Sequence, residues 1–157
     1  MADVRLTLNG QDRSFAVEAR RTLADFLRDE CGLTGTHLGC EHGVCGSCTV
    51  LLDGAPVDSC LVPICQVEGS SVATVEGLAP ETNTLGALQT AFLETGGAQC
   101  GICTPGMLMA GRAYLDAGGG PDDDAIREAI AGNLCRCTGY TKIVEAIARA
   151  ASQGSGR

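Results

Sequence analysis

The number of cysteines limits what this chain can fold into more than any other feature of its sequence. Ten of the 157 residues are cysteine, and so high a count in a short chain indicates disulfides, structural metal or a redox cofactor. The N-terminal stretch "MADVRLTLNGQDRSF" mixes charged and polar residues with apolar ones and has no apolar core of signal-peptide length. We therefore expect a cytoplasmic chain, where thiols stay reduced and metal binding is favoured over disulfides.

Four of the cysteines form a first set in the N-terminal half. Cys40, Cys45 and Cys48 stand in "GCEHGVCGSC", and Cys60 follows after eleven residues. The C-x4-C-x2-C spacing of the first three is typical of plant-type [2Fe–2S] ferredoxins. Glycines between them let the backbone turn sharply enough to place thiolates around a small cluster. We therefore predict a [2Fe–2S] cluster with these four ligands, the fourth returned to the site by a hairpin over 49–58.

A second set lies in the C-terminal half, with Cys100 and Cys103 in "QCGIC" and Cys135 and Cys137 in "GNLCRC". Zinc is the serious alternative here, because C-x2-C with a distant cysteine pair is a pattern of tetrahedral zinc sites. Position favours a cluster, since Cys103 and Cys137 each stand just before a predicted helix, whose free N–H groups stabilise thiolates. We expect Cys135 and Cys137 to bind one iron of a second [2Fe–2S] cluster, and Cys100 and Cys103 to bind the other.

The remaining two cysteines, Cys31 and Cys65, are interpreted as buried small apolar side chains. A Rieske site, in which two histidines replace two cysteines, is not supported by the sequence. The segment "CEH" at 40–42 matches half of that pattern, but the chain has only His37 and His42, and no Cys-x-x-His follows. We expect both histidines to lie at the surface or behind the cluster ligands.

Charge and hydropathy exclude other classes of function. The formal net charge is −8 and Lys142 is the only lysine, so the surface has no basic patch for nucleic acid. No apolar run approaches the roughly 20 residues that a helix needs to span a bilayer, so we expect no membrane span. The sequence also has no phosphate-binding loop, nicotinamide fingerprint or nucleophile–base pair. We therefore expect no substrate chemistry on this chain alone.

The N-terminal half is expected to form a small sheet crossed by one helix. "NG" at 9–10 and "DG" at 53–54 are hairpin turn signals between alternating apolar residues. A capping-box pattern predicts the start of a helix over about 22–31. A short strand is expected through Val72 and Val75. Two hairpins and one crossing helix indicate a β-grasp sheet.

The C-terminal half has the apolar spacing of helices. Polar residues around Pro80 mark the boundary between the two units, and Thr104-Pro105 is an N-cap and N1 pair. Helices are predicted along a stripe of Leu85, Leu88 and Phe92 that ends at Gly96, and over about 104–117, 123–131 and 141–151. The predicted fold class is α+β, with an N-terminal β-grasp ferredoxin-like domain over 1–77 followed by a C-terminal four-helix bundle over 78–157.

Three segments together resemble a known family. "GCEHGVCGSCTVLLDG", "QCGICTPGM" and "GNLCRCTGY" are similar to the small iron–sulfur subunit of the xanthine oxidase family of molybdenum hydroxylases, over nearly the whole chain. The resemblance implies a β-grasp domain and a four-helix domain, each with one [2Fe–2S] cluster. It also implies a large partner subunit with molybdenum and molybdopterin cytosine dinucleotide, and a medium subunit with FAD, arranged as a dimer of heterotrimers.

The resemblance further implies a route for electrons from molybdenum to the C-terminal cluster, then to the N-terminal cluster and then to FAD. Gln99 is expected to hydrogen-bond the pterin through its side-chain amide, and Cys137 to lie close to the pterin. Substrate contacts belong to the large subunit. The segment "THLGCEHGVCGSC" is most similar to subunits of enzymes that hydroxylate N-heteroaromatic or related small compounds.

Two functions of other classes remain as alternatives. One is a stand-alone ferredoxin-type carrier, against which the second set of cysteines speaks, because a diffusible carrier needs only one exposed cluster. The other is an interaction protein stapled by zinc. A zinc protein would be colourless, whereas a [2Fe–2S] protein is red-brown.

Overall fold

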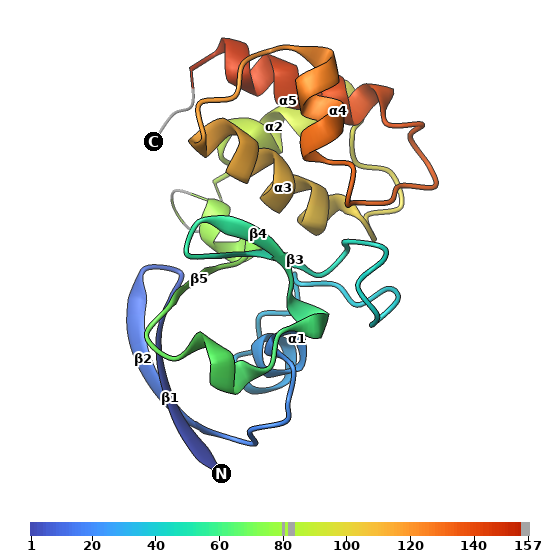
Figure 1. Cartoon of the computed structure of the whole chain (residues 1–157). Coiled ribbons are helices and arrows are strands. Elements are labelled where there is room, and N and C mark those ends of the chain that lie inside the picture. The colour runs from blue at the N-terminus through green and yellow to red at the C-terminus, as the bar shows by residue number, and fades with distance from the viewer. Residues whose placement is uncertain (80, 82–83, 155–157) are drawn as a thin grey trace.

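A computed structural model of the chain describes residues 1–79, 81 and 84–154. Within those residues, five strands lie between residues 2 and 73, and the four longer helices lie between residues 87 and 152. Figure 1 shows the strand-rich unit and the helical unit stacked on each other, with the N-terminus at the end of the strand-rich unit that lies away from the helices. The fold class is therefore α+β. Pro80, where the sequence indicated the boundary, lies outside the described residues.

Two hairpins and a returning strand form one mixed sheet with the order β2-β1-β5-β3-β4. β1 (Ala2–Leu8) pairs with β2 (Gln11–Val17), and β3 (Thr49–Leu52) pairs with β4 (Ala55–Asp58), both antiparallel. β5 (Ser71–Ala73) lies between the hairpins, parallel to β1 and antiparallel to β3. The hairpin predicted over 49–58 is thus confirmed, and it connects Cys48 to Cys60 of the first cysteine set.

Both predicted hairpin turns have left-handed backbone at their two central residues. The φ angles are 47° at Asn9 and 78° at Gly10, and 50° at Asp53 and 84° at Gly54. Asn, Asp and Gly tolerate this conformation, which the tight turns of type I′ require. The local sequence therefore determines both turns.

The first helix begins as predicted and ends differently. α1 (Leu23–Asp25) is capped by Thr22, whose Oγ1 accepts a hydrogen bond from the Asp25 N–H at 3.1 Å. The chain then widens into a π-helical turn over Phe26–Glu30, in which the Cys31 N–H donates to the Phe26 carbonyl at 3.1 Å. The apolar spacing of the sequence, which fits a regular helix, gave no indication of this wider turn.

The strand expected through Val75 is shorter than predicted. It ends at Ala73, and Val75–Leu78 forms a 3-10 turn instead. The chain leaves the sheet because Thr74 is bound by Asn9 of the first turn: the Thr74 N–H donates to Asn9 Oδ1 at 2.8 Å, and Asn9 Nδ2 donates to Thr74 Oγ1 at 3.0 Å. The prediction was wrong because this contact joins residues far apart in the sequence.

The predicted helices of the C-terminal half are present, with small shifts at their ends. They are α2 (Ala87–Thr95), α3 (Thr104–Asp116), α4 (Asp123–Ala129) and α5 (Thr141–Ser152). Gly96 ends α2 with a φ of 76°. The N-cap of α3 is Cys103 rather than Thr104, one residue earlier than expected. No helix among the described residues is long and apolar enough to cross a membrane.

Each unit has its own apolar core in the part of the chain that the structure describes. Phe26, Leu27 and Ile64 are fully buried in the sheet unit, whereas Phe92 and Met107 are buried in the helical unit. α3 lies against β3 and β4 and joins the two units (Figure 1). Because Cys103 is at the N-terminus of α3, the second cysteine set lies at this junction.

Candidate iron–sulfur centres

The first cysteine set lies where the long loop after the π-helical turn meets the β3–β4 hairpin. Cys40 and Cys45 are half-buried, and Cys48 and Cys60 are buried. Cys48 directly precedes β3 and Cys60 follows β4, so the hairpin brings them together. The Ser59 hydroxyl donates to the Cys48 carbonyl at 2.6 Å and fixes this return.

Backbone N–H groups of the loop point at the sulfurs. The N–H groups of Val44 and Cys45 each donate to Cys40 Sγ at 3.4 Å, and the Ser47 N–H donates to Cys45 Sγ at 3.5 Å. Hydrogen bonds from the backbone of His42, and then of Val44 and Cys45, lower the pKa of Cys40 to about 6. The loop therefore favours a thiolate at Cys40, the form that binds metal.

Two positions of this loop need glycine. A Cβ at Gly39 would lie 3.0 Å from Cys45 Sγ. Gly43 has a φ of +74°, and a Cβ there would lie 2.3 Å from Leu61 Cδ1. The loop thus lies close to the Cys45 sulfur at Gly39 and against the Leu61 side chain at Gly43, where the left-handed backbone also favours glycine.

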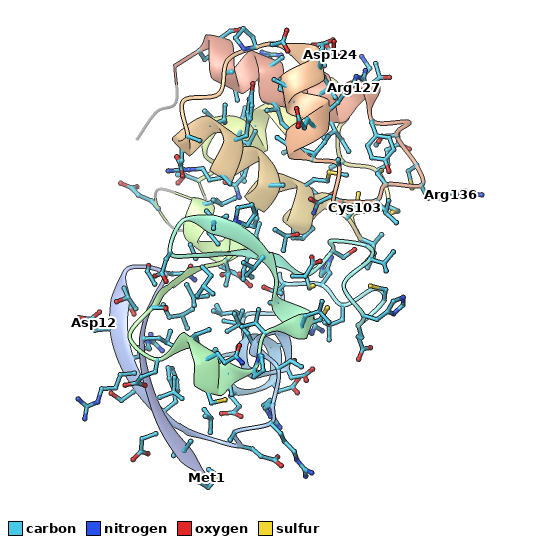
Figure 2. The ribbon with its side chains drawn as sticks, viewed as in Figure 1. Met1, Asp12, Cys103, Asp124, Arg127 and Arg136 are labelled. Atoms are coloured by element: carbon cyan, nitrogen blue, oxygen red, sulfur yellow. The ribbon has the colours of Figure 1, made fainter. Side chains whose placement is uncertain are left out.

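The second cysteine set is built from the loop before α3 and the loop before α5. Cys103 is buried, Cys135 is half-buried, and Cys100 and Cys137 are exposed. Figure 2 shows Cys103 at the end of α3 nearest the sheet unit, and Arg136 projecting away from the molecule. The four thiols therefore range from the buried junction to the outer surface.

Cys137 does not directly precede a helix, contrary to the prediction. α5 begins at Thr141, and its N-cap Tyr140 has a φ of 69°. The residues between form a turn in which the Tyr140 N–H donates to Thr138 Oγ1 at 3.0 Å, and the Thr138 hydroxyl donates to Cys135 Sγ at 3.1 Å. Of Cys103 and Cys137, only Cys103 lies at a helix N-terminus, and Cys135 accepts a hydrogen bond from a hydroxyl instead.

Neighbouring thiols contribute to the raised pKa values of the buried cysteines, Cys60 to that of Cys48, and Cys135 and Cys100 to that of Cys103. The thiols of each set therefore lie close together. The expected sharing of one iron by Cys135 and Cys137 stays a prediction.

The four cysteines of each set are suited to an iron–sulfur cluster, because such clusters are held by cysteine thiolates. Burial, followed by the neighbouring thiols, raises the pKa of Cys48 and of Cys103 to about 12 each. A thiolate at such a buried position needs nearby positive charge, which iron provides. The donor set is thus suited to [2Fe–2S] clusters.

The residues placed near the sites by sequence reasoning have different surroundings. His37 Nδ1 is 3.0 Å from the Ile102 carbonyl oxygen, and the His42 ring contacts the Cys40 carbonyl. Gln99 is exposed at the edge of the second set.

The two cysteines outside both sets differ in burial. Cys31 is half-buried, and burial followed by the charge of Glu30 raises its pKa to about 11. Cys65 is exposed, so its predicted burial is wrong.

The sequence did not indicate that the two cysteine loops touch. The Leu134 N–H donates to the Cys45 carbonyl at 2.9 Å. Asn133 Nδ2 donates to the Gly46 carbonyl at 2.8 Å and to Thr49 Oγ1 at 2.9 Å. These bonds join the loop before α5 to the loop before β3. They depend on the stacking of the two units, so spacing along the chain carries no signal for them.

Comparison with known proteins adds to this geometry. A family model described as "2Fe-2S iron-sulfur cluster binding domain" matches residues 6–79, and one described as "[2Fe-2S] binding domain" matches residues 74–148. The chain is 56% identical over 147 residues to caffeine dehydrogenase subunit gamma of Pseudomonas sp. (strain CBB1), covering 92% of this chain and 87% of that protein.

Two further matches cover nearly the whole chain. It is 50% identical over 151 residues to the nicotine 6-hydroxylase small subunit of Paenarthrobacter nicotinovorans, covering 96% of this chain and 90% of that protein. A chain of the crystal structure of quinoline 2-oxidoreductase from Pseudomonas putida 86 superposes with a TM-score of 0.92 at 50% identity, covering 99% of this chain and 98% of that chain.

Proposed function

This chain belongs to the small iron–sulfur subunits of the xanthine oxidase family of molybdenum hydroxylases, and on that premise we propose how its residues carry electrons. It is an electron-transfer subunit of an oxidoreductase complex and not a stand-alone ferredoxin, because its relatives are named as subunits and it contains two [2Fe–2S] binding domains. Partner subunits carry out the substrate chemistry.

We assign one [2Fe–2S] cluster to each cysteine set. The ligands of the N-terminal cluster are Cys40, Cys45, Cys48 and Cys60, and those of the C-terminal cluster are Cys100, Cys103, Cys135 and Cys137. When bound, each cluster supplies one-electron redox chemistry. The burial of the cysteines supports this assignment, since each set contains both buried thiols and more exposed ones.

The observation that carries the proposal is the direct contact between the two sites. The Leu134 N–H donates to the Cys45 carbonyl at 2.9 Å, and Leu134 is bonded to the ligand Cys135. A ligand of one site is therefore joined to a ligand of the other by one hydrogen bond and a few covalent bonds. Two one-electron sites in such contact are suited to moving electrons singly between a two-electron donor and a two-electron acceptor.

The exposed side of the C-terminal site is proposed to face the molybdenum cofactor of a large subunit. Gln99, Cys100 and Cys137 are all exposed there. An exposed Gln99 amide is free to hydrogen-bond a pterin, and Cys137 is the ligand placed to lie closest to it. Electrons would then enter at the C-terminal cluster and leave from the N-terminal cluster to FAD in a medium subunit.

Exposed apolar side chains beside each site support this arrangement of partners. Ile102 and Leu134 are 50% and 51% exposed beside the C-terminal site, and Val44 and Leu61 are 56% and 59% exposed beside the N-terminal site. Large apolar side chains gathered around a functional site mark an interface. We propose that the large subunit, with molybdopterin cytosine dinucleotide, covers Ile102 and Leu134, and that the FAD subunit covers Val44 and Leu61. The complex is proposed to be a cytoplasmic dimer of heterotrimers.

The domain organisation is proposed as a β-grasp ferredoxin-like domain over 1–77 and a four-helix bundle over 78–157. The separate apolar cores support this division, and the two family matches meet at residues 74–79. Val75 and Leu78 pack against the helical core. Val75, near the end of the first domain, thus already contacts the second.

The substrate is proposed to be an N-heteroaromatic compound. The relatives reported above are named for caffeine, nicotine and quinoline, all of which contain a nitrogen heteroaromatic ring. Because substrate contacts lie in the large subunit, this chain supports only the class of compound.

Anaerobic stopped-flow reduction of the whole complex by its substrate tests the function. Cys60→Ser should leave molybdenum reduction intact and slow FAD reduction severely, because the site nearest FAD is lost. Cys65→Ser, which changes an exposed cysteine outside both sets, is the matched control and should behave as wild type. Normal FAD reduction in Cys60→Ser would overturn the proposed route.

A further inference from the structure

Asn133 reaches from the helical unit into the first cysteine loop. Its side chain is 5% exposed, and its amide donates both of its hydrogens, to the Gly46 carbonyl at 2.8 Å and to Thr49 Oγ1 at 2.9 Å. A buried amide is stable only when its hydrogens are bound. The two bonds therefore fix both the orientation of the amide and the position of the loop that carries it.

The Asn133 amide keeps two consecutive residues of one cysteine loop aligned with two consecutive residues of the other. Asn133 binds Gly46, and the next residue, Leu134, donates its N–H to the Cys45 carbonyl at 2.9 Å. The Leu134 side chain is 51% exposed and so contributes little packing to hold this contact. The position of the Leu134 N–H therefore depends on the adjacent Asn133.

The surroundings of Gly46 leave little room for another arrangement. Its φ is +69°, and a Cβ there would lie 2.5 Å from the Gly132 carbonyl oxygen. A Cβ at Gly106 of α3 would lie 2.1 Å from the Gly46 carbonyl oxygen. The Thr49 hydroxyl donates to that same carbonyl at 2.7 Å. The backbones of both units thus meet closely around a single carbonyl group, which Asn133 and Thr49 bind together.

We propose that Asn133 is a positioning residue for electron transfer, which holds the Leu134 N–H on the Cys45 carbonyl and so sets the coupling between the two cysteine sites. This rests on the ligand assignment proposed above. Electrons tunnel more readily through covalent and hydrogen bonds than across a gap, and the bonded path runs from Cys135 through Leu134 to Cys45. One electron leaves the C-terminal site, which is oxidised, and enters the N-terminal site, which is reduced, without transfer of a proton.

The test uses the whole complex carrying Asn133→Ala or Asn133→Asp. Neither side chain can donate to the Gly46 carbonyl, and the carboxylate would repel it. Thr49→Ser keeps the hydroxyl, and Cys65→Ser changes an exposed residue outside both cysteine sets, so these two variants are the matched controls. Iron content and the EPR signal of each cluster are measured first. The rate of transfer between the clusters is then followed by rapid freeze-quench EPR after flash reduction.

We expect the Asn133 variants to retain full iron and both EPR signals. The rate between clusters should fall severalfold, because the Leu134 N–H is no longer held on the Cys45 carbonyl. The splitting that each reduced cluster causes in the signal of the other should also shrink. Both controls should keep the wild-type rate and splitting.

Other outcomes would overturn the role of Asn133, the ligand assignment or the electron path. Full iron, both signals and an unchanged rate in the Asn133 variants would overturn the role of Asn133, even if they melt at a lower temperature. Absence of either cluster from the wild-type complex would overturn the ligand assignment instead. If the Asn133 variants do not fold, leucic acid at position 134 replaces only the Leu134 N–H by an ester oxygen. An unchanged rate in that protein would overturn the path.

Discussion

The phenolic oxygen of Tyr140 accepts a hydrogen bond from the backbone N–H of Cys135 at 3.0 Å. Tyr140 reaches this position with a left-handed backbone, at a φ of 69°, which is uncommon for a bulky residue. Together with the bonds that Thr138 makes to the Tyr140 N–H and to Cys135 Sγ, this contact closes the last cysteine loop on itself. Tyr140 thus stabilises the loop that presents Cys135 and Cys137.

Tyr140→Phe should therefore weaken the C-terminal site. The Cys135 N–H loses its acceptor, which costs about 1 kcal/mol and lowers the melting temperature by about 2–4 °C in a chain of this size. The EPR signal of the C-terminal cluster should broaden or shift. Tyr114→Phe is the matched control, because the Tyr114 hydroxyl donates to the Gly120 carbonyl in a loop without cysteines. Equal EPR spectra in both variants would contradict this role.

Cys135→Ser should remove only the C-terminal cluster. Metal binding contributes folding free energy to a small metal site, so helical content should also fall, while the sheet unit keeps its own core and its cluster. Iron content should drop to half and one EPR signal should remain. Cys65→Ser should leave iron unchanged. Loss of both clusters from Cys135→Ser would show that the two units do not bind metal independently.

Gly106→Ala should destabilise the chain although alanine favours helices. A Cβ at this position of α3 would lie 2.1 Å from the Gly46 carbonyl oxygen, which is backbone and has little freedom to move. We expect a loss of about 1–3 kcal/mol in the free energy of unfolding, as in other overpacked sites. Gly111→Ala in the same helix meets only the end of the Ile147 side chain, at 3.1 Å, and should cost less. Chemical denaturation compares the two, and a stabilising Gly106→Ala would refute the close contact.

The thiol of Cys40 should ionise at unusually low pH once iron is removed. Its pKa of about 6 lies below the ordinary 9.0 because backbone N–H groups, first that of His42, bind the thiolate. The thiolate therefore stabilises the folded chain fully above about pH 9, and this contribution is lost as pH falls through about 6. Alkylation of Cys40 should level off above about pH 7, whereas Cys48, with a pKa near 12, should resist. Identical pH profiles for both thiols would contradict the folded loop.

Local signals predicted the parts of the fold that depend on local geometry. The turns at Asn9-Gly10 and Asp53-Gly54 were predicted because few residues adopt the left-handed backbone that they require. The end of the last strand at Ala73 was not predicted, because it depends on hydrogen bonds between Thr74 and Asn9, 65 residues apart. The π-helical turn was also missed, since it keeps the apolar residues of that segment buried.

Cysteine spacing grouped the thiols into two sets, and the assignment of all eight as ligands stays a prediction. It could not predict which of the thiols are buried, because only the folded units determine burial. Nor could it predict the junction between the sets. Asn133 and Gly46 are 87 residues apart, and an asparagine in a loop is ordinarily read as a turn residue.

A reductive titration of the full chain, followed by EPR together with iron and zinc analysis, tests the central claim most directly. We predict two distinct [2Fe–2S] signals, one from each cysteine set, each appearing with the uptake of one electron. The potentials should differ because the two sites differ in burial and in hydrogen bonds to sulfur. A single signal, or zinc in place of iron at the second cysteine set, would contradict the account.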